Sequence, residues 1–335
     1  MDYQQILRTE QAITLVKDSF SQLLAQRLNL IKISSPIAVL DGTGINDDLN
    51  GIERPVAFPI KALNEQRAVV VHSLAKWKRL RLKQLGIAQN AGVLTNMQAL
   101  RPDEDYSVLH SVYVDQWDWE QHISPAQRTL DFLKQTVNNI YDALRQTEKL
   151  VEQNYPEIKS VLPETITFIH SEQLLQQYPQ LSPKERENAA ARQYGAVFII
   201  GIGELLSNGE AHDGRAPDYD DWSSRNEDGF NGLNGDILVW HPVLQSAFEL
   251  SSMGIRVSPQ SLATQLEKRN CKERANLYFH NLLLNGELPQ SIGGGIGQSR
   301  VCMFMLKKSH IGQVQVGIWG ETERAALAEE GVQLL

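Results

Sequence analysis

Residues Ser291–Phe304, SIGGGIGQSRVCMF, combine alternating glycines with one arginine. Gly293, Gly295 and Gly297 leave one side of an extended segment without Cβ atoms, so a flat ring can lie directly on the backbone. Arg300 follows three residues after the last glycine, and a guanidinium group grips phosphate through paired hydrogen bonds. The segment therefore indicates a nucleotide site, and a glycine-rich turn before a buried helix is the alternative.

Two common nucleotide motifs do not account for these glycines. The dinucleotide-binding motif G-x-G-x-x-G lies between a strand and a helix of a βαβ unit, and too little chain follows Gly297 to build one. The phosphate-binding loop G-x-x-x-x-G-K-[ST] requires Lys-Ser or Lys-Thr, and neither follows the glycines.

Two acidic residues are placed to hold a metal ion. Residues 236–240 and 248–257 are predicted to form antiparallel strands joined by a turn at 241–247. Asp236 and Glu249 can then face the same space. Two carboxylates near a triphosphate commonly hold Mg²⁺. Arg256 follows seven residues after Glu249 on the same segment.

A second strand pair carries polar residues where a core face is expected. Residues 92–101 are predicted to form a strand that ends at Arg101, followed by Pro-Asp-Glu-Asp. Residues 111–119 alternate strictly, so Gln116 and Asp118 share one face with Val112 and Val114. Polar groups on such a face need a reason. Either the face is solvated or it floors a polar pocket.

The remaining pattern predicts helices that flank strands. Apolar spacing of three and four residues predicts helices, and alternation or short apolar runs predict strands. The expected helices are 4–29, 72–86, 125–153, 172–178, 182–194 and 258–285, and the further strands are 31–37, 55–62, 67–71, 165–169 and 196–202. Pro36 predicts that strand 31–37 lies at a sheet margin or an interface. Residues 55–62 and 67–71 are expected to form a hairpin around Asn64 and Glu65.

Three other segments carry candidate polar groups. Loop 41–51 contains Asp47 and Asp48, and Asp47 is either a turn residue or a ligand. Helix 72–86 has Ser73 near its start, and its Lys76 and Lys78 are two residues apart and cannot share a face. Loop 209–222 is acidic, with Arg215 among Asp218, Asp220 and Asp221, and a long loop of this kind is typical of a lid or a binding loop.

Composition predicts an ordinary globular protein. The chain has 335 residues, a formal net charge of −8 and a pI of about 5.6. The acidic balance disfavours nucleic acid as a partner. Cys271 and Cys302 suit a reducing compartment, and no export signal or membrane-length apolar segment is visible. We expect one catalytic domain, 1–335, that is cytoplasmic and has no membrane or nucleic-acid partner.

The order of motifs resembles the catalytic domain of class II aminoacyl-tRNA synthetases. A helix and strand ending at Pro36, then Leu100-Arg101-x-x-Glu104, then Gly293-x-Gly295-x-Gly297-x-x-Arg300 match its three signature motifs. Six strings go further and resemble the aspartate–ammonia ligase family, the ammonia-dependent asparagine synthetases of the A type. They are HSLAKWKR, LRPDED, SVYVDQWDWE, RAPDYDDW, GLNGDILVW and FELSSMGIRV.

The resemblance implies a fold, a reaction and partners. The fold is α+β, an antiparallel β-sheet flanked by helices, with a homodimer built on the first motif. The reaction is ATP-dependent amidation of L-aspartate by ammonia to L-asparagine, through a β-aspartyl-adenylate and with release of AMP and pyrophosphate. ATP is a substrate, and Mg²⁺ accompanies it.

The resemblance also implies site residues. Arg101 and Arg300 are expected to act on the phosphates, and Asp118 or Asp220 to take the proton that ammonium loses. The ATP set is Arg101, Glu104, Asp236, Glu249, Gly295, Gly297 and Arg300, of which Asp236 and Glu249 hold Mg²⁺. The aspartate set is Asp47, Ser73, Lys78, Gln116, Asp118, Asp220, Ser252 and Arg256.

Two departures disfavour aminoacylation of transfer RNA. Ser299 stands where the synthetase branch commonly has Asp before the arginine of the third motif. Only a handful of residues precede the first helix, where the branch carries its transfer-RNA-reading domain. The alternative function is a class II synthetase paralogue that activates or senses aspartate or asparagine. A paralogue that only senses is expected to have lost phosphate ligands, whereas Arg101, Glu104, Glu249 and Arg300 are all present.

Overall fold

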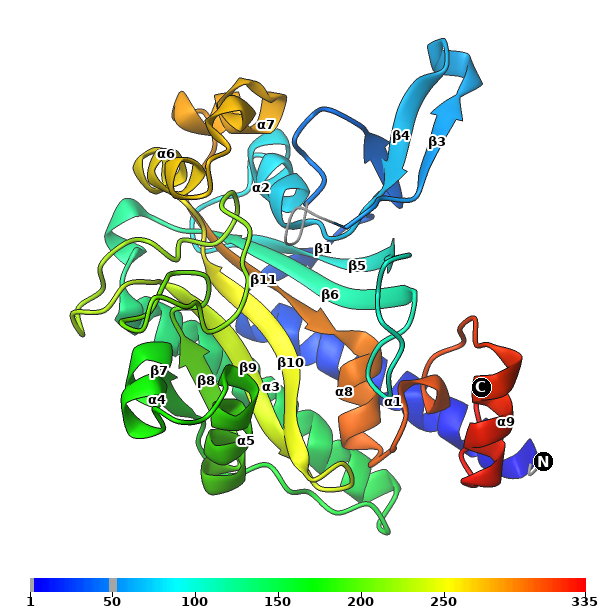
Figure 1. Ribbon diagram of the computed structural model, residues 1–335. Helices are drawn as coiled ribbons and strands as arrows, with labels where there is room; N and C mark the ends of the chain where they lie inside the picture. Colours follow the sequence, from blue (N-terminus) through cyan, green and yellow to red (C-terminus); the bar gives the residue numbers. More distant parts are fainter. Residues whose placement is uncertain (1–2, 48–52) are drawn as a thin grey trace.

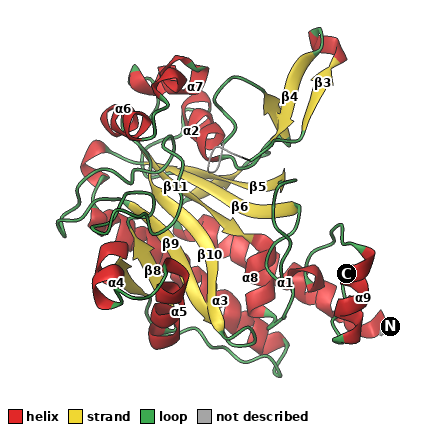
Figure 2. Ribbon diagram, in the orientation of Figure 1, coloured by secondary structure: helices red, strands yellow, loops and turns green. Residues whose placement is uncertain are grey.

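A computed structural model describes residues 3–47 and 53–335, so Asp48 lies outside the described residues. Among these residues the main sheet has eight strands (Figures 1 and 2). Its order is β1 (Leu30–Lys32), β5 (Gly92–Leu100), β6 (Tyr113–His122), β11 (Ser291–Gly297), β10 (Ser246–Ile255), β9 (Asn234–His241), β8 (Ala196–Ile200) and β7 (Thr167–His170). The inner pairs are antiparallel, as predicted, and the outer pairs β1–β5 and β7–β8 are parallel.

The first predicted strand is shorter than expected. β1 ends at Lys32 and forms the sheet edge, in agreement with the position predicted from Pro36. The chain then enters a separate sheet of β2 (Ala38–Leu40), β4 (Gln66–Val70) and β3 (Ala57–Ile60), which projects from the body in Figure 1. The hairpin turn contains the short helix η1 (Lys61–Leu63), and Asn64 and Glu65 adopt positive φ angles of 53° and 63°.

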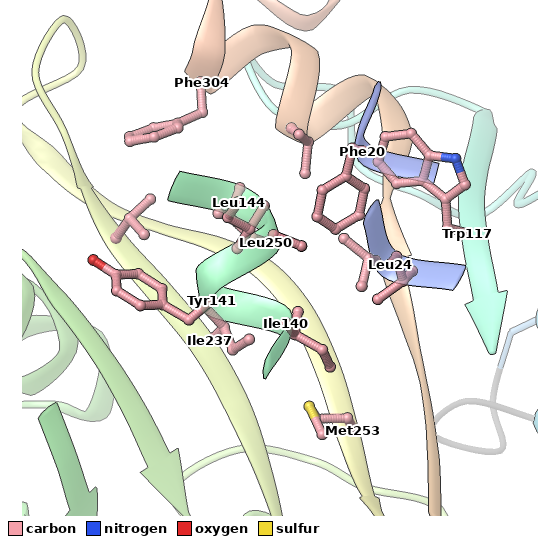
Figure 3. Packing of buried hydrophobic residues seen from close by; sticks show 14 of the residues in the cluster. Phe20, Leu24, Trp117, Ile140, Tyr141, Leu144, Ile237, Leu250, Met253 and Phe304 are labelled. Carbon is pink, nitrogen blue, oxygen red and sulfur yellow. The ribbon is translucent and has the colours of Figure 1, made fainter. Parts of the chain in front are cut away.

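One face of the main sheet is covered by three helices. α1 (Tyr3–Arg27), α3 (Leu130–Asn154) and α8 (Gln298–Met305) supply apolar side chains to one buried cluster with the strands (Figure 3). Trp117 and Trp119 of β6 point into it, and the ring of Phe20 lies 4.6 Å from that of Trp117. Because residues alternate along β6, this burial turns Gln116 and Asp118 to the opposite face.

The opposite face is only partly covered. α4 (Ser171–Gln177) and α5 (Pro183–Tyr194) lie against β7, β8 and β9, and α2 (Ala75–Gln84), α6 (Pro259–Lys268) and α7 (Tyr278–Leu284) form a second group. The predicted helix 258–285 is broken after α6 because Asn270 has a φ of 53°, and η3 (Lys272–Asn276) precedes α7. The predicted helix 125–153 begins as η2 (Pro125–Gln127). η4 (Ile311–Gln313) and α9 (Glu321–Glu329) complete the described elements.

Between residues 3 and 335, excluding 48–52, no helix is long and apolar enough to cross a membrane.

Candidate active site

A row of side chains crosses five strands on the partly covered face of the sheet. Asp236 of β9 pairs with Ser252 of β10, Ser252 with Gly295 of β11, Gly295 with Asp118 of β6, and Asp118 with Thr95 of β5. Directly paired residues on neighbouring strands share a face. Three predicted ligands from the metal and aspartate sets, Asp236, Ser252 and Asp118, therefore lie on one line, and Gly295 of the ATP set lies between Ser252 and Asp118.

A β-bulge brings Glu249 to the same face. The register between β9 and β10 shifts between Glu249 and Ser251, and the extra residue, Leu250, is buried in the core. A bulge of this kind re-aims the side chain next to it. Ser252 Oγ then donates to Glu249 Oε1 at 3.0 Å. The register therefore agrees with the prediction that Asp236 and Glu249 face one space.

The two carboxylates influence each other. Burial and the charge of Glu249 raise the pKa of Asp236 to about 7, although Arg215 acts in the opposite direction. Burial acts to raise the pKa of Glu249, but Arg300, Arg215, Lys184 and the hydrogen bond from Ser252 together lower it. A second positive charge would relieve the repulsion that remains between them.

A cavity of about 490 Å³ opens over this face. Most predicted site residues line it: Ser73, Arg101, Glu104, Gln116, Asp118, Asp220, Glu249, Ser252, Arg256, Gly295, Gly297 and Arg300. Asp47, Lys78 and Asp236 are buried one layer behind. Each of these three contacts a residue of the lining, through Ser73, Asp118 and Arg215 respectively.

Arg101 and Arg300 converge at one end of the cavity. Arg101 follows β5, and its Nη2 donates to the carbonyl of His72 at 3.1 Å. Arg300, in the first turn of α8, donates from Nη1 to the carbonyl of Glu249 at 3.1 Å. Burial lowers the pKa of Arg101. The negative charge of Glu104 partly offsets this effect, and the positive charge of Arg300 adds to the lowering. Two cations that repel each other in one cavity form a site for an anion.

His110 holds Arg300 and was not identified from the sequence. Its Nε2 lies 2.7 Å from Arg300 Nη2, so the neutral ring accepts a hydrogen bond. Ser107 Oγ lies 2.9 Å from Nδ1. Burial and the charge of Arg300 lower the pKa of His110 to about 4, which keeps the ring neutral near pH 7.

Arg256 is held by two acids. Its Nε and Nη2 donate to Glu120 at 3.1 and 2.9 Å, and its Nη1 pairs with Asp220. Ser291 Oγ also donates to Glu120, at 2.7 Å. Glu120 was missed in the sequence, although it continues the alternation of Gln116 and Asp118 by one further step.

The alternating glycines of β11 do not leave a bare surface throughout. A Cβ atom on Gly293 would lie 1.9 Å from Glu120 Oε2, and one on Gly295 would lie 2.6 Å from Gln116 Oε1. The expectation of an open platform is therefore wrong at Gly293 and Gly295, because the carboxylate of Glu120 and the amide of Gln116 fill those spaces. Gly294, Gly295 and Gly297 line the cavity.

The two lysines of α2 reach different partners, as their spacing predicted. Lys78 pairs with Asp118 and donates to the carbonyl of Gly294 at 2.9 Å. Lys76 Nζ lies 3.1 Å from Asp218 and 3.7 Å from Asp47. Ser73 does not cap the helix.

Asp47 supports the start of α2. It accepts hydrogen bonds from the backbone nitrogen of Ala75 at 2.8 Å and from the hydroxyl of Ser73. Burial raises the pKa of Asp47, and Lys76 partly offsets this.

The acidic loop is fixed against the end of β10. Asp221 donates from its backbone nitrogen to the carbonyl of Ile255 at 2.9 Å, and Val257 donates to the carbonyl of Tyr219 at 2.9 Å. These bonds place Asp220 beside Arg256. The loop therefore contributes fixed walls to the cavity.

The sheet, its helices and the order of the motifs define the catalytic-domain fold of class II aminoacyl-tRNA synthetases. Solved asparaginyl-tRNA synthetases share it. The enzyme of Pyrococcus horikoshii complexed with asparaginyl-adenylate matches with a TM-score of 0.66 and 14% identity, over 93% of this chain and 70% of that one. That of Entamoeba histolytica matches with a TM-score of 0.64, 13% identity, and coverage of 93% and 67%.

Sequence comparison identifies the family. The family model described as aspartate–ammonia ligase matches residues 7–331. Aspartate–ammonia ligases of Parabacteroides distasonis and Bacteroides fragilis are 56% and 54% identical, each over 98% of this chain and 95% of the relative. That of Clostridium perfringens is 51% identical over 98% of this chain and 95% of the relative. The chain belongs to the aspartate–ammonia ligase family.

Proposed function

We propose that this chain makes L-asparagine from L-aspartate, ammonia and ATP, with release of AMP and pyrophosphate. The observation that carries the proposal is one cavity with two chemically distinct ends. Arg300, with Arg101 near it, is held at Glu249 of β10, whereas Arg256, seven residues further along, is held by Glu120 and Asp220. This arrangement suits a triphosphate beside a small zwitterion, in a chain that belongs to the aspartate–ammonia ligase family.

The chemistry requires activation of the side-chain carboxylate. Ammonia does not displace oxide or hydroxide from a carboxylate, because the leaving group is too poor. Attack of a β-carboxylate oxygen on the α-phosphorus of ATP forms β-aspartyl-adenylate and releases pyrophosphate. Ammonia then attacks the carbonyl carbon of the activated β-carboxyl group, the bond from that carbon to the AMP oxygen breaks, and asparagine, AMP and a proton result. Positioning and charge neutralisation are what the protein supplies.

The phosphate groups are assigned to the arginine end. We assign Arg101 to the α-phosphate and Arg300 to the γ-phosphate side, because both guanidinium groups line the cavity and lie near each other. Glu104, Gly295 and Gly297 complete the ATP contacts. His110 acts through Arg300, whose guanidinium it holds.

Asp236 and Glu249 are suited to Mg²⁺. Glu249 helps to raise the pKa of buried Asp236 to about 7, and a divalent cation would relieve this repulsion. Among the described residues no group of three or more Asp, Glu, His or Cys side chains is arranged to hold a metal ion, so the phosphates and water would supply the other ligands. Bound there, the ion would neutralise phosphate charge.

The aspartate is assigned to the opposite end. We propose that Arg256 holds the carboxylate that does not react, while Ser73, Gln116 and Ser252 line the same space. Lys78 and Asp47 lie one layer behind and hold Asp118 and Ser73 in place. Asp118 and Asp220 are the carboxylates that face ammonium and can accept its proton.

Product analysis tests the proposal. The protein is incubated with ATP, Mg²⁺, aspartate and ammonium, and products are separated by mass spectrometry. We expect asparagine and AMP in equal amounts. Arg101→Ala should lower kcat by roughly 10²–10³ while making the same products, because one charge-stabilising donor is lost. ADP would contradict the adenylate route, and AMP that depends on transfer RNA instead of ammonium would favour the synthetase paralogue.

We also propose a cytoplasmic homodimer. Ile31 of the edge strand β1 and Ile37, which precedes β2, both belong to the first motif and are 57% and 61% exposed. Apolar side chains of this size at a sheet edge favour burial against a second copy of the chain. Two buried, unpaired cysteines, Cys271 and Cys302, are compatible with a reducing compartment and support this part of the proposal.

A further inference from the structure

Arg215 stands between the two halves of the cavity. It belongs to the loop that connects β8 to β9, and its side chain is 9% exposed. Nη2 lies 2.5 Å from Asp236 Oδ1, and Nε lies 3.5 Å from Asp220 Oδ2. One guanidinium group therefore spans a carboxylate of the proposed metal pair and a carboxylate of the proposed aspartate pocket. Arg215 lines the cavity, whereas Asp236 lies behind it.

The backbone of Arg215 is held while its side chain has an unused donor. Arg269 Nη2 donates to the carbonyl of Gly203 at 2.9 Å and reaches the carbonyl of Arg215 at 3.4 Å. A Cβ atom on Gly203 would lie only 2.8 Å from that of Arg215, so the two segments pack closely. Arg215 Nε is buried and has no hydrogen-bond partner, since its approach to Asp220 is not aligned. A buried donor without an acceptor is costly and favours the arrival of one.

A divalent cation on Asp236 and Glu249 would compete directly with Arg215. Arg215 already occupies Oδ1 of Asp236, and two positive groups on one carboxylate repel each other at contact distance. If the cation displaces Nη2, the guanidinium keeps Asp220 as its acid partner and has donors directed at the cavity. The aspartate substrate brings a reacting carboxylate to this space, close to the phosphates.

We infer that Arg215 is a movable counter-ion that neutralises Asp236 when no cation is bound there, and binds the reacting carboxylate of aspartate once Mg²⁺ takes Asp236. The inference rests on the proposed function. Arg215 thereby couples the two sites, so that Mg²⁺ with nucleotide tightens the binding of aspartate. In the same position, the guanidinium of Arg215 offsets the negative charge of the substrate carboxylate that must approach phosphorus.

Two binding measurements on Arg215→Met test the inference. In the first, the full-length protein is titrated with Mn²⁺ alone, and electron paramagnetic resonance measures the concentration of free Mn²⁺. We expect the variant to bind Mn²⁺ roughly fivefold or more tightly than wild type, because the competing cation is gone. The second measures aspartate by calorimetry with Mg²⁺ and a non-hydrolysable ATP analogue. We expect the variant to bind aspartate at least about tenfold more weakly, and to lose the tightening that nucleotide gives wild type.

Arg269→Met is the matched control, because Arg269 supports the same loop but contacts neither acid. A loosened loop should weaken both ligands or neither, so opposite changes in Arg215→Met exclude a merely structural role. Weakening of both ligands by Arg215→Met, or an unchanged affinity for either, overturns the inference. If the inference is overturned but wild-type protein still makes asparagine, the proposed function stands. Wild-type protein that binds no Mn²⁺ overturns the magnesium assignment and the inference together.

Discussion

Arg256 illustrates how far one residue can be interpreted from its surroundings. Its guanidinium is shared between Glu120 and Asp220 inside the protein, and it still lines the cavity. Glu120 and Asp220 fix the direction of the Arg256 guanidinium. The carboxylate and ammonium groups of the zwitterionic substrate can then take over part of the pairing between Arg256 and these two acids. A ligand without the carboxylate that does not react should be rejected, since it offers no charge to this buried cation.

The affinity for aspartate should therefore depend strongly on Arg256. We expect Arg256→Met to raise the aspartate Kd by roughly thirtyfold or more, the effect of truncating one partner of a buried charge pair. The Kd of ATP, measured in the same calorimetric series, should stay within about threefold, because the phosphates bind at the other end. Glu120→Gln keeps the arginine but loosens it, and should give an intermediate value. An unchanged aspartate Kd in Arg256→Met would remove this role.

His110 gives a pH dependence with a definite sign. Its pKa falls from the usual 6.5 to about 4 on folding, so the unfolded chain binds the proton more readily. Stability should then fall as pH drops from about 6.5 to about 4. The full shift corresponds to about 3 kcal/mol. Because His110 is 38% exposed, screening reduces the expected loss to the order of 1 kcal/mol.

Denaturant unfolding at pH 7 and pH 5 measures this effect. His110→Gln retains an acceptor for Arg300 but does not titrate, so it should lose less stability than wild type over that interval. Equal losses in the two proteins would show that the imidazole carries no share of the pH dependence.

At the scale of residues, the alternation of polar and apolar residues predicted part of the site. The other contacts join residues that are far apart in the sequence, and local patterns did not predict them. The polar face of β6 was predicted, including Gln116 and Asp118. Glu120 lies one step beyond the predicted strand, and its partner Arg256 is 136 positions away. His110 lies in an irregular loop, where no periodicity shows the direction of a side chain. Contacts of this kind depend on the packing of whole elements and cannot be derived from local patterns.

At the scale of elements, the glycines of β11 serve two different faces. Gly295 lies over Gln116 at the cavity, whereas a Cβ atom on Gly294 would lie 2.5 Å from Met253 Cβ and 2.8 Å from the carbonyl of Ser252. The end of a flexible side chain can move away from a new methyl group, and the backbone of a neighbouring strand cannot. The two positions should therefore respond differently to alanine.

Gly295→Ala should impair binding while leaving the fold intact. We expect its thermal midpoint to stay close to that of wild type, while the KM of aspartate or ATP rises because Gln116 is pushed into the cavity. Gly294→Ala should instead lose stability, by about 1–3 kcal/mol, as overpacked cores do. Melting curves and steady-state kinetics separate the two effects. Loss of stability by Gly295→Ala with a normal KM would contradict the assignment of this glycine to the cavity.

Element boundaries and register were less predictable than element types. The predicted strand 31–37 became a short edge strand, and helix 258–285 divided at Asn270, a residue type that favours positive φ at helix ends but that the apolar spacing alone did not mark. The bulge at Leu250 decides that Glu249 faces the cavity. Two carboxylates in adjacent strands indicate a metal-binding pair, but only the register determines whether both side chains lie on the same face of the sheet.

At the scale of the whole molecule, the exposed edge of the sheet bears on assembly. Sedimentation at micromolar concentration should give twice the mass of 37.7 kDa. Ile31→Glu combined with Ile37→Glu should shift the protein to monomer, since charge opposes burial of the edge. Val161 is an exposed apolar residue elsewhere on the surface, and Val161→Glu serves as the control. A wild-type monomer at all concentrations would exclude the dimer.

The central claim is that a side-chain carboxylate is adenylated within one cavity, and oxygen transfer tests it most directly. Aspartate carrying a heavy oxygen isotope in its β-carboxylate is supplied with ATP, Mg²⁺ and ammonium, and AMP is recovered for mass spectrometry. Attack on the α-phosphorus predicts that each AMP gains one labelled oxygen and that pyrophosphate gains none. Unlabelled AMP, or label recovered in inorganic phosphate, would contradict the account.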